Sequence, residues 1–95
     1  MPTVLRAPPF RVIILNPPRE HGPPHVHIRK GFGMGEGEVV IALGVTANGV
    51  TERVSVREVY QMATRDVVAA VRLAEANLAQ LREQWRAIHG EANGA

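Results

Sequence analysis

The chain has 95 residues, which provides for one hydrophobic core, and its 45% apolar content excludes a disordered protein. It has no cysteine, so disulfides and thiolate chemistry are excluded, and its net charge of +2 is only weakly basic. No apolar run approaches the ~20 residues that span a bilayer, and the N-terminus lacks a signal-peptide pattern. We expect a cytoplasmic single domain over residues 1–90, with a flexible tail over 91–95.

The first part of the chain alternates short strand-like segments with breaks rich in proline and glycine. Residues 10–15 are mostly apolar and β-branched, so they predict a strand. Residues 16–24 contain four prolines, which favour a stiff loop. Residues 25–30 alternate with period two and predict a second strand. The alternate glycines that follow predict a permissive connector.

Two further strands are expected on either side of a hairpin. Residues 39–43 form a short apolar run and predict a third strand. Asn48-Gly49 is the most specific hairpin signal in the chain and should lead into a fourth strand over residues 50–56. Residues 57–63 are ambiguous between the end of a strand and a helical turn.

One long helix is predicted after these strands. Apolar residues recur at alternating spacings of four and three from Val67 through Trp85 to Ile88. Thr64 is a candidate N-cap, and His89-Gly90 end the pattern. The predicted fold is therefore α+β: a small antiparallel β-meander of three to four strands, followed by one long C-terminal helix packed on one face.

The strand segments at residues 12–15 and 39–43 are apolar at both parities. An antiparallel sheet with one wet face should instead alternate, and a single helix covers only one face. We therefore expect the other face to be partly covered, either by a second copy in a homodimer or by a different protein. The alternative is a sheet that curls and covers itself.

The residues that could carry chemistry gather in one block, because His21, His25 and His27 fall within seven positions. On one strand, His25 and His27 would share a face, with β-carbons ~7 Å apart. A turn at residues 22–24 could fold His21 back toward them. These three histidines are the candidate site. The neighbouring basic residues, which are candidate substrate-binding groups, are Arg19, Arg29 and Lys30.

The histidine block has three interpretations. Paired imidazoles, which titrate near neutral pH, can exchange protons in phosphodiester cleavage, as in a metal-independent endoribonuclease. A His-x-His pair with a further histidine or with Glu20, Glu36 or Glu38 can instead hold zinc or another divalent metal. The third interpretation is a recognition surface, or histidines that fasten the loop by hydrogen bonds. No motif in the chain requires a cofactor.

Basic residues also recur on the predicted helix. Arg65, Arg72 and Arg86 lie on one heptad stripe, and Arg82 lies beside it. Such a stripe can contact the phosphates of RNA or DNA. It is more typical of a solvated face, so we expect these side chains to be exposed.

The block His21-Gly22-Pro23-Pro24-His25-Val26-His27 resembles the hallmark of a known family, domain of unknown function 4160. Residues 3–6 with 10–12 resemble the opening of that family, and residues 85–90 resemble its closing helix. The resemblance implies a small cytosolic protein that is often encoded beside another short protein, in an arrangement like a toxin–antitoxin pair. It implies no settled activity and no catalytic residues.

These observations favour a regulatory module of a toxin–antitoxin-like pair. Such a module would bind a cognate small protein encoded nearby and, as an extension, RNA or DNA. The alternatives are the endoribonuclease and the metal-binding protein. Replacing His25 and His27 together by alanine is expected to keep the fold and remove the function, whereas an unfolded variant would show that these histidines are structural.

Overall fold

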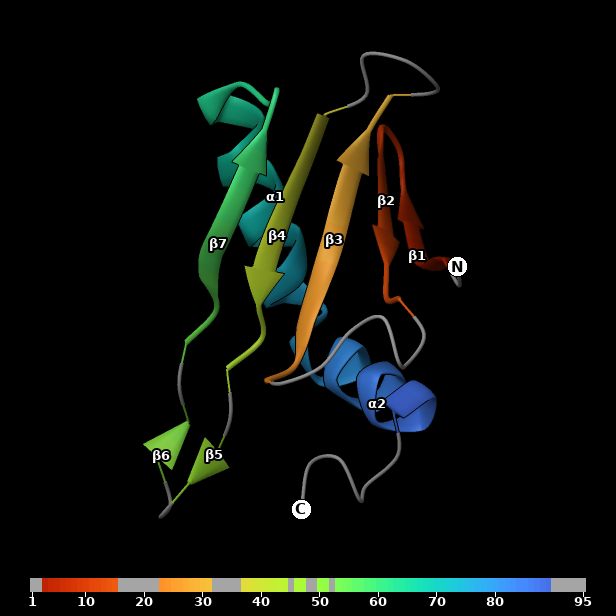
Figure 1. Cartoon of the computed structure of the whole chain (residues 1–95), viewed down its shortest axis with the longest axis vertical. Coiled ribbons are helices and arrows are strands. Elements are labelled where there is room, and N and C mark those ends of the chain that lie inside the picture. Colours follow the sequence, from red (N-terminus) through yellow and green to blue (C-terminus); the bar gives the residue numbers. More distant parts are fainter. Residues whose placement is uncertain are drawn as a thin grey trace.

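A five-stranded antiparallel sheet, in the order β1-β2-β3-β4-β7, forms the body of the protein (Figure 1). The computed structural model describes residues 3–15, 23–31, 37–44, 46–47, 50–51 and 53–89. A small ribbon of two strands joins β4 to β7. The strands are β1 (Thr3–Ala7), β2 (Phe10–Ile13), β3 (His25–Lys30), β4 (Gly37–Ala42), β5 (Thr46–Ala47), β6 (Val50–Thr51) and β7 (Ser55–Tyr60).

The helical part consists of α1 (Thr64–Ala76) and α2 (Leu78–His89), so the prediction of one long helix is wrong. The break falls at Asn77, whose side-chain Nδ2 donates a hydrogen bond to the carbonyl of Leu73 at 3.0 Å. An asparagine side chain that bonds the preceding turn competes with the helical backbone pattern. Figure 1 shows α1 behind β4 and β7, and α2 across the end of the sheet where β3 begins.

The ends of the helices differ in part from the sequence prediction. The N-cap of α1 is Ala63 rather than Thr64, and no side chain caps this end. The last residue of α2 is His89, as expected. In the described parts of the chain, neither helix is long and apolar enough to cross a membrane.

The sheet has five strands, where three to four were predicted. The additional strand is β1, whose apolar residues Val4 and Leu5 are adjacent and too few to show a period in the sequence. The predicted fourth strand is divided between β6 and β7, and the ambiguous residues 57–60 belong to β7. Asn48-Gly49 lies outside the described residues; Ala47 and Val50, on either side of it, are paired antiparallel.

The hydrophobic core lies between the sheet and the two helices. Alternate residues of each strand point to one face, so β2, β3 and β4 each contribute several side chains to the core. The stripe predicted for the helix meets them, and it is buried at Ala74, Leu81 and Trp85. The fully buried strand residues of this core are Val12, Val26, Ile28, Val39 and Ile41.

We call the opposite side of the sheet the second face; it is defined by Arg6, Arg11, Ile13, His27, Arg29, Glu38 and Val40. Ile13 is 2% exposed and Val40 is 4% exposed, although neither belongs to the main core. The single chain therefore already covers these two apolar side chains. The presence of these apolar residues on the second face therefore does not by itself require a partner, and the expectation of a partner needs other support.

Gly37, at the start of β4, is required by the packing of the segment after β7. A β-carbon at this position would lie 2.7 Å from the backbone oxygen of Gln61, closer than real β-carbon contacts. Gln61 itself has a φ of 49°, in the left-handed region that non-glycine residues seldom adopt. A side chain at position 37 would therefore collide with the backbone at Gln61.

Candidate functional site

The structure brings two of the three predicted histidines together at the start of β3. The His25 and His27 rings have centroids 5.5 Å apart in an edge-on arrangement. His25 is only 3% exposed, and its Nδ1 donates to the carbonyl of Pro23 at 3.0 Å. His27 is partly exposed, with 12% of its side chain accessible. His21 lies outside the described residues.

An unbroken series of rings continues from these histidines to α2. The rings of His25 and Trp85 have centroids 5.0 Å apart, and Trp85 stacks on His89 at 3.8 Å. His89 is buried, and its Nε2 donates to the carbonyl of Leu15 at 2.9 Å. His25 and His89 therefore attach α2 to the end of the sheet, and His27 is left as the histidine that faces the second face.

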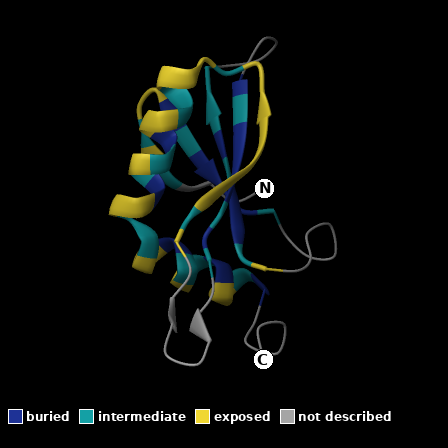
Figure 2. Ribbon diagram, turned by 90° about the vertical axis from the view of Figure 1, so that its left-hand side faces the viewer, coloured by how far each residue is buried: buried dark blue, intermediate teal, exposed yellow. Residues whose placement is uncertain are grey.

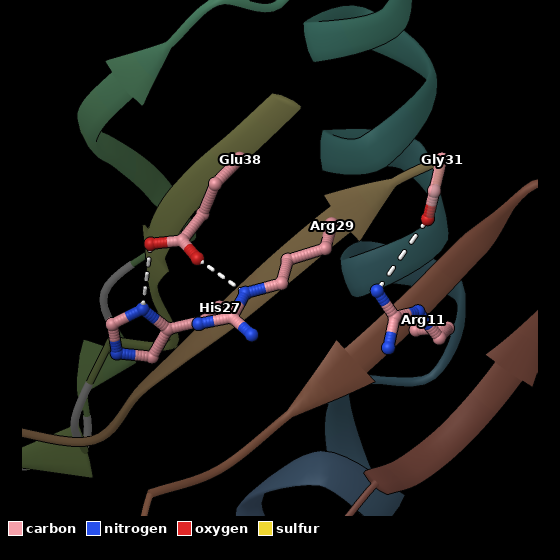
Figure 3. Close-up of polar contacts among 5 residues, drawn as sticks. All are labelled: Arg11, His27, Arg29, Gly31 and Glu38. Carbon is pink, nitrogen blue, oxygen red and sulfur yellow. Dashed lines mark hydrogen bonds and ion pairs between the residues drawn. The ribbon is translucent and has the colours of Figure 1, made fainter. Parts of the chain in front are cut away.

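Glu38 lies at the centre of the polar groups on the second face (Figure 3). Its Oε1 accepts a hydrogen bond from Nε of Arg29 at 2.6 Å, and its Oε2 accepts one from Nδ1 of His27 at 3.1 Å. The register explains both contacts, because Arg29 is directly opposite Glu38 and His27 is diagonal to it. The carboxylate thus orients an imidazole and a guanidinium at once.

Burial by itself would raise the pKa of the Glu38 carboxyl. The hydrogen bonds from Arg29 and His27, together with the charges of those two side chains, act in the opposite direction and outweigh it. The pKa of Glu38 is therefore held below its ordinary value, and the side chain is a carboxylate at neutral pH.

Three arginines stand side by side across the second face. The register places Arg6 opposite Arg11 and Arg11 opposite Arg29, so neighbouring strands carry like charges at directly opposed positions. Such pairs are destabilising in a sheet. Glu38 is next in the same cross-strand row, directly opposite Arg29. We call Arg6, Arg11 and Arg29 the arginine row. A concentration of positive charge of this kind favours an anionic partner.

A backbone carbonyl helps to hold the row in place. Nη2 of Arg11 donates to the carbonyl of Gly31 at 3.4 Å, at the end of β3 (Figure 3). Arg29 has 25% of its side chain exposed, and Arg6 is exposed. The row therefore lies at the surface and is oriented by the strands rather than by a loop.

Lys30, another of the predicted basic residues, does not join this cluster. Lys30 points to the helix side of the sheet, where its Nζ donates to Asp66 of α1 at 2.9 Å. It therefore lies on the opposite side from Arg29. Arg19 lies outside the described residues.

Three of the four arginines expected on a solvated helix face are exposed, and the fourth, Arg82, is not. Arg65, Arg72 and Arg86 are exposed. Arg82, beside them, is partly buried and donates from Nη2 to the carbonyl of Leu43 at 2.9 Å.

The described residues contain no group of three histidine or acidic side chains that could hold a metal ion. Glu38, one of the carboxylates considered as a third ligand, is instead engaged by Arg29 and His27. His21, Glu20 and Glu36, the other proposed ligands, lie outside the described residues.

Sequence reasoning did not identify Arg6 and Arg11 as site residues. Both lie in strands far from the histidine block in the sequence, and only the register of β1, β2 and β3 brings them next to Arg29. The sequence did contain a signal that Arg11 lies on the face away from the core, because it directly precedes the buried Val12 in a strand with period two. The missing information was which residues of the three strands stand opposite one another.

The fold and this cluster define a class of small α+β protein: an antiparallel meander with an arginine row on one face and two helices on the other. The chain belongs to the family described as domain of unknown function DUF4160, whose model matches residues 10–86. This match extends from β2 into α2 and includes Arg11, His27, Arg29 and Glu38. No curated protein and no solved structure matches the chain.

Proposed function

We propose that this chain is a regulatory component of a toxin–antitoxin-like pair, and that it binds the small protein encoded beside it through the arginine row. The proposal places the complex in the cytoplasm. The observation that carries it is the row itself: Arg6, Arg11 and Arg29 are aligned at directly opposed positions, which concentrates positive charge on one face of the sheet. An acidic surface on a partner would complement that charge.

The geometry favours binding over a purely structural role. Side chains on a sheet are held more precisely than side chains on a loop, and the Arg29 guanidinium is oriented further by Glu38. Arginine is enriched at binding interfaces, where its fork can engage carboxylates by two hydrogen bonds. The row therefore has both the charge and the fixed spacing that recognition of an acidic protein surface requires.

The experiment measures the affinity between this chain and its neighbour-encoded protein by titration calorimetry. Reversing two charges of the row, in an Arg6→Glu/Arg11→Glu variant, should weaken binding about 100-fold, since like charges across an interface cost several kcal/mol. The matched control is Arg65→Glu/Arg72→Glu, which makes the same charge change at exposed positions on α1. The control should bind like the wild type. Equal losses in both variants, or a wild-type chain that does not bind, would contradict the proposal.

A second candidate, the metal-independent endoribonuclease, is favoured by the contact between His27 and Glu38. A carboxylate on one ring nitrogen of a histidine is the arrangement that orients a general base, and Arg29 lies beside the pair to hold a phosphate. His25 is a weaker choice for the proton transfer, because it is buried against Trp85.

This candidate predicts that total RNA is cleaved in the presence of EDTA and that a His27→Ala variant loses the cleavage. Arg72→Ala, a change at an exposed residue of α1, is the control and should cleave normally. If neither the wild type nor the control cleaves RNA, with or without divalent ions, this candidate is excluded and the binding proposal is left unaffected.

A further inference from the structure

Strand β7 is an edge of the sheet, and it is exposed over its whole length. In the described part of the chain it pairs only with β4, and each of its six residues is exposed. Figure 2 is viewed toward this edge and shows the strand as one continuous exposed band. An edge strand presents a row of backbone N–H and C=O groups that can pair with a further strand.

Exposed apolar side chains gather at this edge. Among the described residues, the large hydrophobic side chains that are exposed are Val56, Val59 and Tyr60 of β7 and Val68 of α1. Their exposed fractions, from 42% to 53%, are unlike those of the valines on the central strands β3 and β4, which are at most 4% exposed. An apolar surface confined to one sheet edge is typical of an interaction site.

The register places the two valines of β7 on one side of the sheet. Val56 stands opposite Ile41 and Val59 opposite Val39, so both lie on the side that the helices cover. A shift in the pairing leaves Arg57 as an extra residue between them, as in a β-bulge. Glu58 stands opposite Val40 and therefore belongs to the second face.

Val68 of α1 lies on the same side of the molecule as β7. Asp66 bonds Lys30 of β3, so that side of α1 is turned toward the middle of the sheet. Val68 is two residues further on, or ~200° around the helix, and points in the opposite direction. Because α1 packs on β4 and β7, a side chain that points away from the middle of the sheet, as Val68 does, points toward the β7 edge.

The sequence of β7 is complementary to itself in the antiparallel direction. A two-fold axis between Arg57 and Glu58 would place Arg57 opposite Glu58 of a second copy, twice. The same axis would place Val56 opposite Val59, and Ser55 opposite Tyr60. Opposite charges are thus matched at Arg57 and Glu58, and apolar side chains at Val56 and Val59, on the correct side of a continuous sheet.

We propose that β7 pairs antiparallel with β7 of a second copy of this chain, which joins the two five-stranded sheets into one. The valines of the two edges meet under the helices, and two Arg57–Glu58 pairs fix the register on either side of the axis. This homodimer goes beyond the function proposed above, because it uses the edge of the sheet and leaves the arginine row accessible on both copies.

The test is a set of charge exchanges measured by sedimentation equilibrium. Arg57→Glu alone or Glu58→Arg alone places like charges together at two symmetric positions, and each should raise the dimer dissociation constant about tenfold or more. The Arg57→Glu/Glu58→Arg double variant restores opposite charges and should dimerise nearly as well as the wild type. Only a partner that carries the same substitutions can give this rescue. Arg86→Glu, at an exposed position on α2, is the control and should not alter dimerisation.

Three outcomes would overturn the proposal. They are a wild-type chain that remains monomeric at all accessible concentrations, single variants that dimerise like Arg86→Glu, and a double variant weaker than either single one. Amide hydrogen exchange of the wild type gives a result that does not depend on any variant folding. The amides of residues 55–60 should become more protected as protein concentration rises. Protection that appears only when the neighbour-encoded protein is added would instead identify a different partner for this edge.

Discussion

Replacing Trp85 by alanine should lower the free energy of unfolding by about 3–5 kcal/mol, the usual cost of removing a buried aromatic side chain. Trp85 is 7% exposed and lies between two histidine rings, at 5.0 Å from His25 and 3.8 Å from His89. Its loss would leave a cavity where α2 meets the sheet and would remove a ring contact from each histidine. A domain of this size has a total stability on the order of 5–15 kcal/mol, so the variant should be only marginally folded.

Urea denaturation followed by far-UV circular dichroism measures this effect. Fluorescence cannot be used for the comparison, because Trp85 is the only tryptophan of the chain. Arg86→Ala, one residue further along α2 and exposed, is the matched control and should change stability by less than about 0.5 kcal/mol. A loss below about 1 kcal/mol in Trp85→Ala would show that the ring series does not hold α2 against the sheet.

Glu38→Gln should cost about 1.5–3 kcal/mol of stability at neutral pH, the range for hydrogen bonds to a charged group. The side chain is 19% exposed and accepts hydrogen bonds from both Arg29 and His27. Without its negative charge, Glu38 no longer offsets the positive charge of Arg29 beside it. The variant should also weaken partner binding less than reversal of Arg6 and Arg11, because it removes no cation.

The pH dependence of stability separates this effect from simple loss of packing. Because the pKa of Glu38 is lower in the folded chain than in the unfolded chain, its contribution is fully present above the ordinary value of 4.5. The contribution is lost as pH falls through the depressed folded-state pKa. Stability of the wild type should therefore fall toward that of Glu38→Gln over this acidic range.

Glu75→Gln is the control for that measurement. Its carboxylate lies 3.7 Å from Nη2 of Arg53, and both side chains are well exposed, so the pair should contribute little. The difference in stability between Glu75→Gln and the wild type should be small and nearly independent of pH. A Glu38→Gln variant whose deficit stays constant from neutral to acidic pH would contradict the assigned role of the carboxylate.

The sequence predicted the class of the fold correctly and the details of its helical part incorrectly. An α+β meander followed by helix could be inferred because the periodicity changes from two to a spacing of three and four after residue 64. The apolar stripe continues with the same spacing across Asn77, so periodicity could not reveal that the helix is interrupted there. The break depends on a side-chain hydrogen bond to Leu73, which spacing does not encode.

The candidate site could be predicted only where its residues share a strand. His25 and His27 are two positions apart, so their proximity follows from period two alone. Glu38, which bonds His27, comes from β4, and its place beside His27 depends on which residues face each other across the sheet. Lys30 is the opposite case: it is next to Arg29 in the sequence, but its side chain bonds Asp66 on the helix side of the sheet and so lies outside the site.

The structure also changes the expectation for the double histidine variant. His25 is buried, bonds the carbonyl of Pro23 and contacts Trp85, so replacing it removes core contacts. A variant that lacks both histidines is therefore expected to lose stability as well as function. His27→Ala alone, on the second face, is the change that addresses the site.

Recognition of an acidic partner by the arginine row is most directly measured by NMR, following the Nε–H signals of arginine as the neighbour-encoded protein is added. If the arginine row binds the partner, the signals of Arg6, Arg11 and Arg29 should shift during the titration, while those of Arg65 and Arg72 on α1 should not. If the signals of the helix arginines move and those of the three strand arginines stay unchanged, the second face is not the binding surface.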